Sequence, residues 1–244
     1  MVSVCIATYN GEKYIKKQIE SILLQLEKDD EIIVSDDNSS DRTIQIVNEI
    51  NDDRIKIYIH KRDFVKKKHC VGYYCSNNFS HAISKASGDY ILLADQDDVW
   101  YENKVSEIVG VLQKFDICMS NFSIINEKEE LIKEKYYQNN PITNNWFYNL
   151  NKNVYFGCCM AFKSNIKNLF MPIPNTIVSY DTWIATKCLL KKKKIDYIDK
   201  PLIYYRRHGN NISQATGNSN NSIFFKFFWR LQFLSTLLFY KLKG

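Results

Sequence analysis

Asp95, Asp97 and Asp98 place three carboxylates within four consecutive positions of the chain. Like charges this close together lower stability unless a cation or strong hydrogen-bond donors offset them. A divalent cation is the simplest answer, because oxygen ligands suit Mg²⁺ or Mn²⁺, which typically bridge a protein carboxylate and the phosphates of a substrate. The alternative is a solvated acidic turn. Apolar residues precede the cluster, and Val99 and Trp100 follow it. Since they would hold the turn against a core, we favour the metal interpretation.

The elements that must position this cluster alternate as in a parallel sheet with crossover helices. Short apolar runs predict strands over residues 2–7, 31–35, 55–59 and 90–94, the last of which leads into Asp95. Apolar residues at helical spacing between these runs predict helices. The expected N-caps of the helices are Asn10, then Ser40 or Asp41, then Ser76, and Gly88 suits the position after the third helix.

Three polar loops follow strand ends, at residues 8–10, 36–37 and 95–98. In open α/β sheets, ligands bind beyond the carboxyl ends of the strands. We therefore expect these distant segments to converge on one site. The second half of the chain is less regular, with strands expected over 117–125, 155–162 and 202–205, a helix over 181–191, and an irregular loop over the site at 136–150.

Three ordered motifs give the chain a resemblance to the inverting family 2 glycosyltransferases, which have the GT-A fold. They are Val4-Cys5-Ile6-Ala7-Thr8-Tyr9-Asn10, then Ser35-Asp36-Asp37-Asn38-Ser39-Ser40-Asp41-Arg42-Thr43, then Gly88-Asp89-Tyr90 leading into Asp95-Gln96-Asp97-Asp98-Val99-Trp100. The resemblance spans about residues 1–210 and is strongest before Lys104. It implies an α/β fold: a single GT-A-type, Rossmann-like catalytic domain over residues 1–215, with a mainly parallel central sheet flanked by helices, followed by a C-terminal amphipathic helix over residues 222–243.

The resemblance implies a nucleotide-sugar donor bound by the first two motifs. Thr8, Tyr9 and Asn10 would line the base pocket, with Tyr9 packing on the base. Asp36 or Asp37 would accept a hydrogen bond from the base imide, which would reject bases without that donor. Glu12 would reach the ribose. The competing interpretations are that Tyr9 is an ordinary core aromatic and that Asp36 and Asp37 cap a helix.

The third motif would hold the metal, with Asp97 as a ligand, Asp95 facing the ribose or the metal, and Asp98 as their neighbour. A transferase also needs a base for the acceptor proton, and the resemblance assigns this role to Asp181. Members of the family usually have another acid or a His before this residue, whereas here Tyr180 precedes it. The competing interpretation is that Asp181 caps its helix.

Residues 206–211 resemble a stretch that some family members place near the metal and the diphosphate. Arg pairs with phosphate through two parallel donors, and a neutral His can complete a metal shell. Two adjacent Arg side chains on a strand cannot both point inward, so we assign Arg206 to the phosphates and His208 to the metal. The alternative is a plain basic surface turn.

Residues 223–242 are nearly continuous in apolar and aromatic side chains but contain Lys226, Arg230 and Lys241. These cations fall on one side of a helix, which is typical of a helix that lies in a membrane interface. The alternatives are packing against protein and a true membrane span. These three cations and Lys243 contribute four of the positive charges behind the net charge of +6. The rest of the chain is close to neutral, which argues against nucleic-acid binding.

Seven cysteines without a C-x-x-C pair favour a reducing compartment. A zinc site at His69, Cys70 and Cys75 lacks a second ligand pair. The predicted strand directly after Met1 leaves no room for a signal peptide, so we expect a cytoplasmic protein, peripheral at the inner face of the cell membrane. Basic runs at 61–68 and 191–194 could meet an anionic acceptor or be solvated faces.

The expected function is transfer of a sugar from a UDP- or dTDP-linked donor to a hydroxyl of a saccharide or lipid-linked saccharide, with inversion, in bacterial surface polysaccharide synthesis. The chain looks like a subgroup that includes rhamnosyl- and hexosyltransferases. The alternative is a non-catalytic, membrane-attached module that binds nucleotide sugars. Neither a G-x-G-x-x-G nor a G-x-x-x-x-G-K-[ST] motif follows the first strand. The sequence makes no prediction of oligomeric state.

Overall fold

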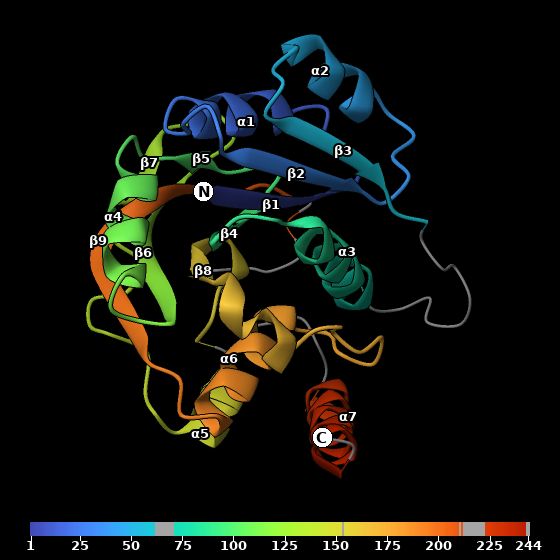
Figure 1. The fold of residues 1–244 in the computed structure, drawn as a ribbon, viewed down its shortest axis with the longest axis vertical. Coiled ribbons are helices and arrows are strands. Elements are labelled where there is room, and N and C mark those ends of the chain that lie inside the picture. Colours follow the sequence, from blue (N-terminus) through green and yellow to red (C-terminus); the bar gives the residue numbers. More distant parts are fainter. Residues whose placement is uncertain (62–70, 153, 210, 212–222, 243–244) are drawn as a thin grey trace.

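A computed structural model describes residues 1–61, 71–152, 154–209, 211 and 223–242. Within these residues, one curled sheet runs in the order β3-β2-β1-β4-β8-β6-β9-β5, and β7 pairs with β6 (Figure 1). Helices lie on both sides of this sheet, so the predicted α/β fold is confirmed. The sheet is mixed, however, because its second half contains antiparallel pairs.

The first half is parallel throughout. β1 pairs with β2 and with β4, and β2 pairs with β3, all in parallel register. The first two helices lie over one face of these strands and the third lies over the other (Figure 1). The bounds are β1 Val2–Thr8, α1 Ile15–Leu23, β2 Glu31–Asp36, α2 Thr43–Ile50, β3 Ile55–Ile59, α3 Val71–Lys85 and β4 Tyr90–Asp95.

The second half extends the sheet around β6, whose nine residues are all buried. β8 joins β4 to β6 through two antiparallel pairings, and the long strand β9 runs parallel to β6. The bounds are β5 Val99–Trp100, α4 Lys104–Leu112, β6 Ile117–Ile125, β7 Leu131–Lys133, α5 Trp146–Lys152, η1 Gly157–Cys159, β8 Met160–Lys163, η2 Ser164–Leu169, α6 Tyr180–Leu190, β9 Ile195–Arg206 and α7 Ile223–Leu242.

Several local predictions were wrong. Asn10 does not cap α1, which begins at Ile15, and its φ of 49° places it in the left-handed region. Ser76 lies inside α3 and is buried. Gly88 follows α3 by three residues and serves close packing instead, since a Cβ there would lie 2.8 Å from the backbone nitrogen of Ser3. The strand predicted from residue 155 begins only at Met160, after a 3₁₀ turn.

The C-terminal helix α7 packs against α6 and α3. The ring of Trp183 on α6 meets Phe233 and Tyr240 of α7 at centroid distances of 5.6 and 5.7 Å. Tyr73 of α3 donates a hydrogen bond to Gln232 of α7 at 2.6 Å. Among the helices in the described part of the chain, none is long and apolar enough to cross a bilayer.

Candidate active site

The strands β1, β2 and β4 end at the same edge of the sheet. Thr8, the last residue of β1, lies opposite Asp36, the last residue of β2, and Ala7 lies opposite Asp95, the last residue of β4. This register brings the three polar loops together, as the topology of a parallel sheet requires. The predicted convergence of residues 8–10, 36–37 and 95–98 is therefore present in the structure.

Gln96 joins the first and third of these loops. Its Oε1 accepts hydrogen bonds from Thr8 Oγ1 at 2.5 Å and from the backbone N–H of Tyr9 at 2.9 Å, and its Nε2 donates to the Tyr9 carbonyl at 3.3 Å. Gly11 permits this approach, because a Cβ there would lie 2.4 Å from Gln96 Oε1. The sequence analysis missed this role, although an amide among three acids was a signal for it.

The second loop is tied to the first by its own set of contacts. The backbone N–H of Asn10 donates to Ser39 Oγ at 2.8 Å, and Asn10 Oδ1 accepts from the backbone N–H of Ser40 at 2.9 Å. A carboxylate oxygen of Glu12 accepts from the backbone N–H of Arg42 at 3.0 Å. Asn10 and Glu12 thus position the loop in this structure. Tyr9 is 39% exposed, so it is not a core aromatic.

Asp36 and Asp37 are both buried but have different partners. The Asp36 carboxylate accepts from the backbone N–H and the hydroxyl of Ser39, at 2.8 and 2.5 Å. The Asp37 carboxylate lies 2.6 Å from Nδ1 of His60, beyond the end of β3. Neither residue caps α2, whose N-cap position is Arg42. The prediction of Ser40 or Asp41 as the N-cap was therefore wrong by one or two residues, although Asp41 does accept from the backbone N–H of Thr43 at 2.9 Å.

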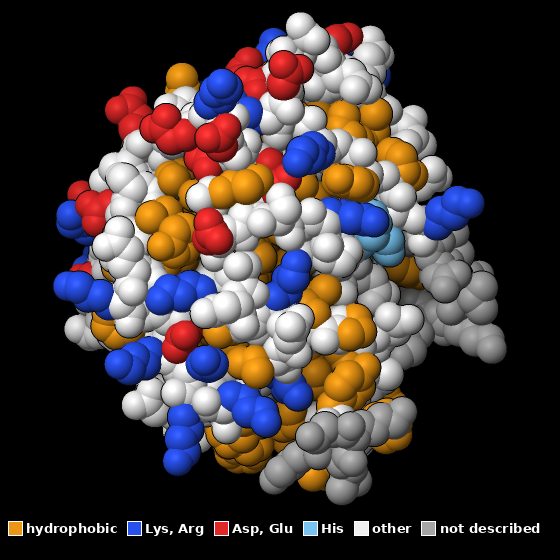
Figure 2. All heavy atoms as spheres, in the orientation of Figure 1, with side chains coloured by type: hydrophobic (Ala, Val, Ile, Leu, Met, Phe, Trp, Pro, Cys, Tyr) orange, Lys and Arg blue, Asp and Glu red, His pale blue; other side chains and the backbone are white. Residues whose placement is uncertain are grey.

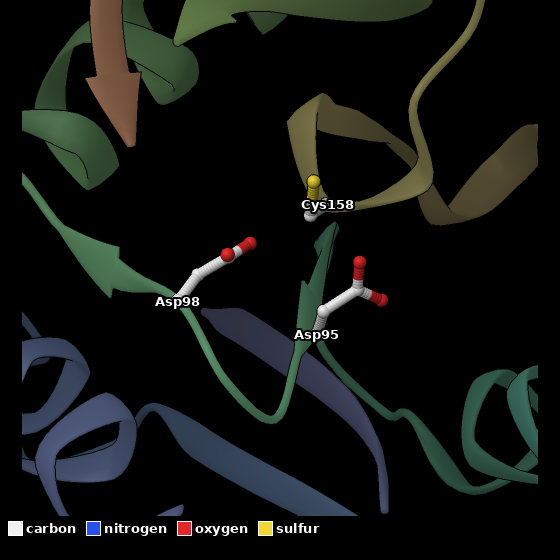
Figure 3. Close-up of side chains that lie close together, drawn as sticks. All are labelled: Asp95, Asp98 and Cys158. Atoms are coloured by element: carbon white, nitrogen blue, oxygen red, sulfur yellow. The ribbon is translucent and has the colours of Figure 1, made fainter. Parts of the chain in front are cut away.

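Asp95 and Asp98 point toward the same space as the Cys158 sulfur (Figure 3), and the potential ligand atoms of the three residues lie within 4.8 Å of one another. Burial, reinforced by the charges of Asp97 and Asp181, raises the pKa of Asp95 to about 7. Burial also raises the pKa of Asp98. One oxygen of Asp98 accepts from the backbone N–H of Arg206 at 3.0 Å, and the other has no partner among the described residues. The crowding of charge expected from the sequence is therefore present.

Asp97 faces a different neighbour. Its Oδ2 lies 2.8 Å from Nε2 of His208, and the two side chains are only 14% and 8% exposed. The ring of Tyr14 stacks on His208 with centroids 5.0 Å apart. His208 therefore reaches the acidic turn, which argues against a plain surface turn at this position.

Arg206 lies behind the acidic turn and is 2% exposed. Its Nε donates to the backbone carbonyl of Asp97 at 2.9 Å, and its Nη2 pairs with Glu129 at 3.0 Å. Its guanidinium also stacks on the Tyr14 ring at 4.9 Å. In this structure Arg206 fixes the turn that carries Asp97. The sequence analysis assigned Arg206 to the phosphates and did not predict these contacts.

Two overlapping sets of side chains could hold a divalent cation. One consists of Asp97 and His208 with Asp95 nearby, and the other of Asp95, Asp98 and Cys158. A thiol binds a metal as its thiolate. The Cys158 thiol pairs with Cys159 and is buried, and both effects raise its pKa well above the usual range. Carboxylate and imidazole ligands suit Mg²⁺ or Mn²⁺ better than a protonated thiol does, so the first set fits these ions better.

Asp181 lies in the first turn of α6, close enough to Asp95 for its charge to raise the pKa of Asp95. Burial raises the pKa of Asp181 itself. Its carboxylate accepts from the hydroxyl of Ser179 and from the backbone N–H of Thr182, the latter at 2.7 Å. Asp181 thus helps to satisfy the helix start and also lies beside the acidic cluster, so the two interpretations of this residue are compatible.

The remaining sequence predictions fall outside the cluster. His69 and Cys70 lie outside the described residues, as does most of the basic run at 61–68. Cys75 is half-buried on α3, and its thiol is near enough to Asp95 for that charge to contribute to its raised pKa. The predicted irregular loop at 136–150 includes the start of α5, and its Tyr136 stacks on Phe122 of β6 at 4.5 Å.

Comparison with known families identifies the kind of protein. Residues 3–170, more than half of the chain, match the family model described as glycosyl transferase family 2. The chain belongs to glycosyl transferase family 2. The predicted family is thereby confirmed, and the motifs that predicted it lie at the strand edge that holds Thr8, Asp36 and Asp95.

Two similar glycosyltransferases of Escherichia coli are named for their reactions. The chain is 28% identical to the UDP-Glc:alpha-D-GlcNAc-diphosphoundecaprenol beta-1,3-glucosyltransferase WfaP, over 87% of this chain and 80% of that protein. It is 29% identical to WfgD, which carries the same reaction name, over 90% of this chain and 80% of that protein.

Solved structures support the GT-A fold of this family 2 glycosyltransferase. TarS of S. aureus in complex with UDP-GlcNAc superposes with a TM-score of 0.65 at 20% identity, covering 88% of this chain and 61% of that chain. The mannosyltransferase PcManGT of Pyrobaculum calidifontis, in complex with GDP-Man and Mn²⁺, superposes with a TM-score of 0.56 at 19% identity, covering 82% and 54%. The chain thus spans less than two thirds of these two solved chains.

Proposed function

We propose that this family 2 glycosyltransferase moves a sugar from a UDP- or dTDP-linked donor to a hydroxyl of a saccharide or lipid-linked saccharide, with inversion, in bacterial surface polysaccharide synthesis. The observation that carries the proposal is the placement of Asp97 and His208, Asp95 and Asp181 beside the strand edge that ends in Thr8 and Asp36. The names of WfaP and WfgD, which specify a UDP-Glc donor and a diphosphoundecaprenol-linked acceptor, support the lipid-linked acceptor. The bound UDP-GlcNAc of TarS supports a UDP donor.

The nucleotide would lie over the ends of β1 and β2. Tyr9, exposed at the end of β1, would stack on the base, and Thr8 and Asn10 would line the pocket as parts of the same loop. We assign the imide contact to Asp37, because Ser39 donates to both carboxylate oxygens of Asp36, whereas the contact of Asp37 with His60 uses one oxygen, Oδ1. Glu12 would stabilise the second loop and approach the ribose from there.

A Mg²⁺ or Mn²⁺ ion would be held by Asp97 and His208, with Asp95 as a ligand or as a contact to the ribose. When bound, the ion would offset the negative charge of the diphosphate leaving group. The three raised carboxyl pKa values at Asp95, Asp98 and Asp181 support a cation, since each records the cost of placing charge there without one. Arg206 would orient Asp97 from behind and would not bind phosphate itself.

Asp181 would act as the base. As the acceptor oxygen forms its bond to the anomeric carbon, the bond from that carbon to the diphosphate oxygen breaks and the hydroxyl proton passes to the Asp181 carboxylate. The diphosphate leaves with the bonding electrons. Attack opposite the leaving group gives inversion. The raised pKa of Asp181 suits the role, because a stronger base accepts a proton more readily.

The helix α7 would attach the domain of residues 1–215 to a membrane, at the inner face of the cell membrane. One face of α7 packs on α6, and the opposite face exposes large apolar side chains. Lys and Arg side chains gather over the region of α5 and α6 on the face shown in Figure 2, where they would favour anionic lipids. The most exposed apolar residues of α7 are Phe224, Phe227, Phe228, Leu231, Leu238 and Phe239.

The decisive experiment is release of nucleoside diphosphate from a panel of UDP- and dTDP-sugars, with a polyprenyl-diphosphate saccharide as acceptor, with and without chelator. We expect acceptor-dependent turnover that requires metal and falls by orders of magnitude in Asp97→Ala. Full activity of Asp97→Ala would refute the metal site. Metal-dependent nucleotide binding without turnover on any acceptor would instead favour the non-catalytic binding module.

Membrane attachment is tested separately by co-sedimentation with vesicles of phosphatidylglycerol or of phosphatidylcholine alone. The wild-type protein should sediment with the anionic vesicles, and the double variant Phe227→Ser with Phe228→Ser should remain in the supernatant. A matched control is Leu24→Ser, which changes an exposed apolar residue after α1. Equal sedimentation of all three proteins would refute the role of α7.

A further inference from the structure

His60 contacts the carboxylate of Asp37 from the neighbouring strand. Its Nδ1 lies 2.6 Å from Asp37 Oδ1, and the two side chains are 22% and 2% exposed. The backbone N–H of His60 also donates to the Asp36 carbonyl at 2.7 Å, which continues the pairing of β3 with β2. The main chain therefore fixes the imidazole at the position where it can meet Asp37.

A second histidine extends this contact into a network behind the strand edge. The rings of His60 and His81 lie 5.0 Å apart, and His81 Nδ1 is 2.8 Å from Ser35 Oγ. Ser35 Oγ donates to Asn78 Oδ1 at 2.5 Å, and Asn78 Nδ2 donates to the Thr8 carbonyl at 3.1 Å. Polar contacts from β3 and α3 thus support the ends of both β1 and β2.

The far side of His60 is not packed in the core. His60 and His81 line an open cavity of about 320 Å³ together with Ser84 and other residues of α3 and of the segment 171–175. Removing the imidazole would enlarge this cavity and would not leave a sealed void. A change at His60 should therefore affect Asp37 more than it affects folding.

The contact between His60 and Asp37 bears on how a nucleotide base would be recognised. Uracil and thymine present an N3–H donor, whereas cytosine presents an acceptor at the same position. A carboxylate selects the donor only while it is ionised and oriented. An imidazole Nδ1–H that donates to one oxygen restricts rotation of the carboxylate and so fixes the direction of its other oxygen.

We propose that His60 is a positioning residue that sets base selectivity by holding the Asp37 carboxylate oriented toward the imide of uracil or thymine. The inference rests on the proposed role of Asp37 as the imide acceptor. A purely structural role for His60, tying β3 to β2, makes a different prediction: loss of His60 would lower stability and leave base selectivity unchanged.

Calorimetry with UDP and CDP in the presence of Mn²⁺, on the full chain, distinguishes these roles. We expect His60→Ala to weaken UDP binding about tenfold, the scale of one hydrogen bond to a charged group, and to leave CDP binding nearly unchanged. His60→Asn should restore most of the preference for UDP, because its amide can donate from nearly the position of Nδ1. Ser84 lines the same cavity, and its hydroxyl donates to the His81 carbonyl at 2.7 Å. Ser84→Ala is the matched control and should bind both nucleotides as the wild type does.

An unchanged ratio of UDP to CDP affinity in His60→Ala would overturn the inference, whether or not the melting temperature falls. Failure of His60→Asn to restore that ratio would also overturn it. Asp37→Asn separates this failure from that of the proposed function. If Asp37→Asn loses the preference for UDP while His60→Ala keeps it, only the role of His60 is wrong. If Asp37→Asn keeps the preference, the imide contact itself is wrong, and the inference falls with it.

Discussion

Two parts of the candidate site are held together by different interactions. One is the edge formed by the loops after β1, β2 and β4, where we propose that the nucleotide binds and which we call the nucleotide edge. The other is the side formed by α6. At the nucleotide edge, loops from three strands are linked by hydrogen bonds such as those of Gln96 to Thr8 and Tyr9. On the α6 side, Asp181 is carried by a helix that is fixed by aromatic packing, with Tyr180 stacked on Phe79 at 4.2 Å. Changes at the nucleotide edge should therefore alter donor binding at nearly constant stability, whereas changes beneath α6 should alter stability first.

The largest expected effect is on the chemistry at the N-terminal end of α6. Asp181→Asn should lower kcat by about 10²- to 10⁴-fold, because the amide cannot take the acceptor proton. The fold should persist, since the amide oxygen can still accept from the backbone N–H of Thr182. The measurement is steady-state turnover beside a thermal melt.

Asp199→Asn is the control for this change, because Asp199 is exposed and its ion pair among the described residues is with Lys135. A kcat of Asp181→Asn within a few-fold of the wild-type value would exclude Asp181 as the base. It would also mean that the α6 side of the site does not supply the catalytic base.

The packing beneath α6 should give the largest effect on stability. Trp183 is fully buried, donates from Nε1 to the Phe170 carbonyl at 3.0 Å, and contacts α7. Trp183→Ala should lower the free energy of unfolding by about 3–5 kcal/mol. Trp183→Phe should cost less, because it keeps part of the ring packing. Urea unfolding measures both. A loss in Trp183→Ala no larger than that of Trp146→Ala, at a half-buried tryptophan, would contradict the dominant role of Trp183 in this packing.

The nucleotide edge should respond in the opposite way. Gln96→Ala removes the contacts to Thr8 and Tyr9, and we expect the KM for the donor to rise about tenfold, with kcat and the melting temperature nearly unchanged. Gln113→Ala, at an exposed amide after α4, is the matched control. A Gln96 variant that loses stability without any change in KM would show that the two sides are built alike.

The smallest effect concerns pH and metal. The pKa of Asp95 rises from 3.8 to about 7 on folding, so the folded chain binds this proton more tightly than the unfolded chain. The resulting loss of stability is absent below pH 3.8, grows as the pH rises, and is complete above about 7. A cation offsets it, so Mn²⁺ should raise the melting temperature by a few degrees more at pH 8 than at pH 5. An equal rise in melting temperature at both pH values would contradict a link between the Asp95 charge and the cation. In Asp95→Asn, the rise caused by Mn²⁺ should be the same at pH 8 and pH 5.

The sequence predicted the nucleotide edge well because that edge follows from local patterns. Apolar runs located β1, β2 and β4, and a parallel sheet must bring their ends together. The hydrogen-bond partners of the polar residues were harder to predict from the sequence. Gln96, His60 and Arg206 act through contacts with residues far along the chain, and no local pattern records which neighbour a side chain will meet.

The errors in element boundaries have a similar origin. Asn10 and Ser76 are good N-cap residues, but in this fold Asn10 bonds to the loop after β2 and Ser76 is buried inside α3. The C-terminal helix was predicted at the right place. Packing against protein was an alternative in the sequence analysis, without named partners. The structure contains such packing, on Trp183 and Tyr73, alongside an exposed apolar face.

The pairing of the short strand β5 with β9 has a consequence for the order in which the protein can fold. Val99 and Trp100 pair with Tyr204 and Ile203, and Arg206 reaches back to Asp98 across 108 positions of sequence. Contacts of such long range form late and slow folding. At a synthesis rate of about 5–20 residues per second, roughly 5 to 20 seconds separate the synthesis of the acidic turn from that of its anchor. During that interval a nascent chain would carry the parallel half with its acidic turn still unanchored, and the site would close only as β9 docks.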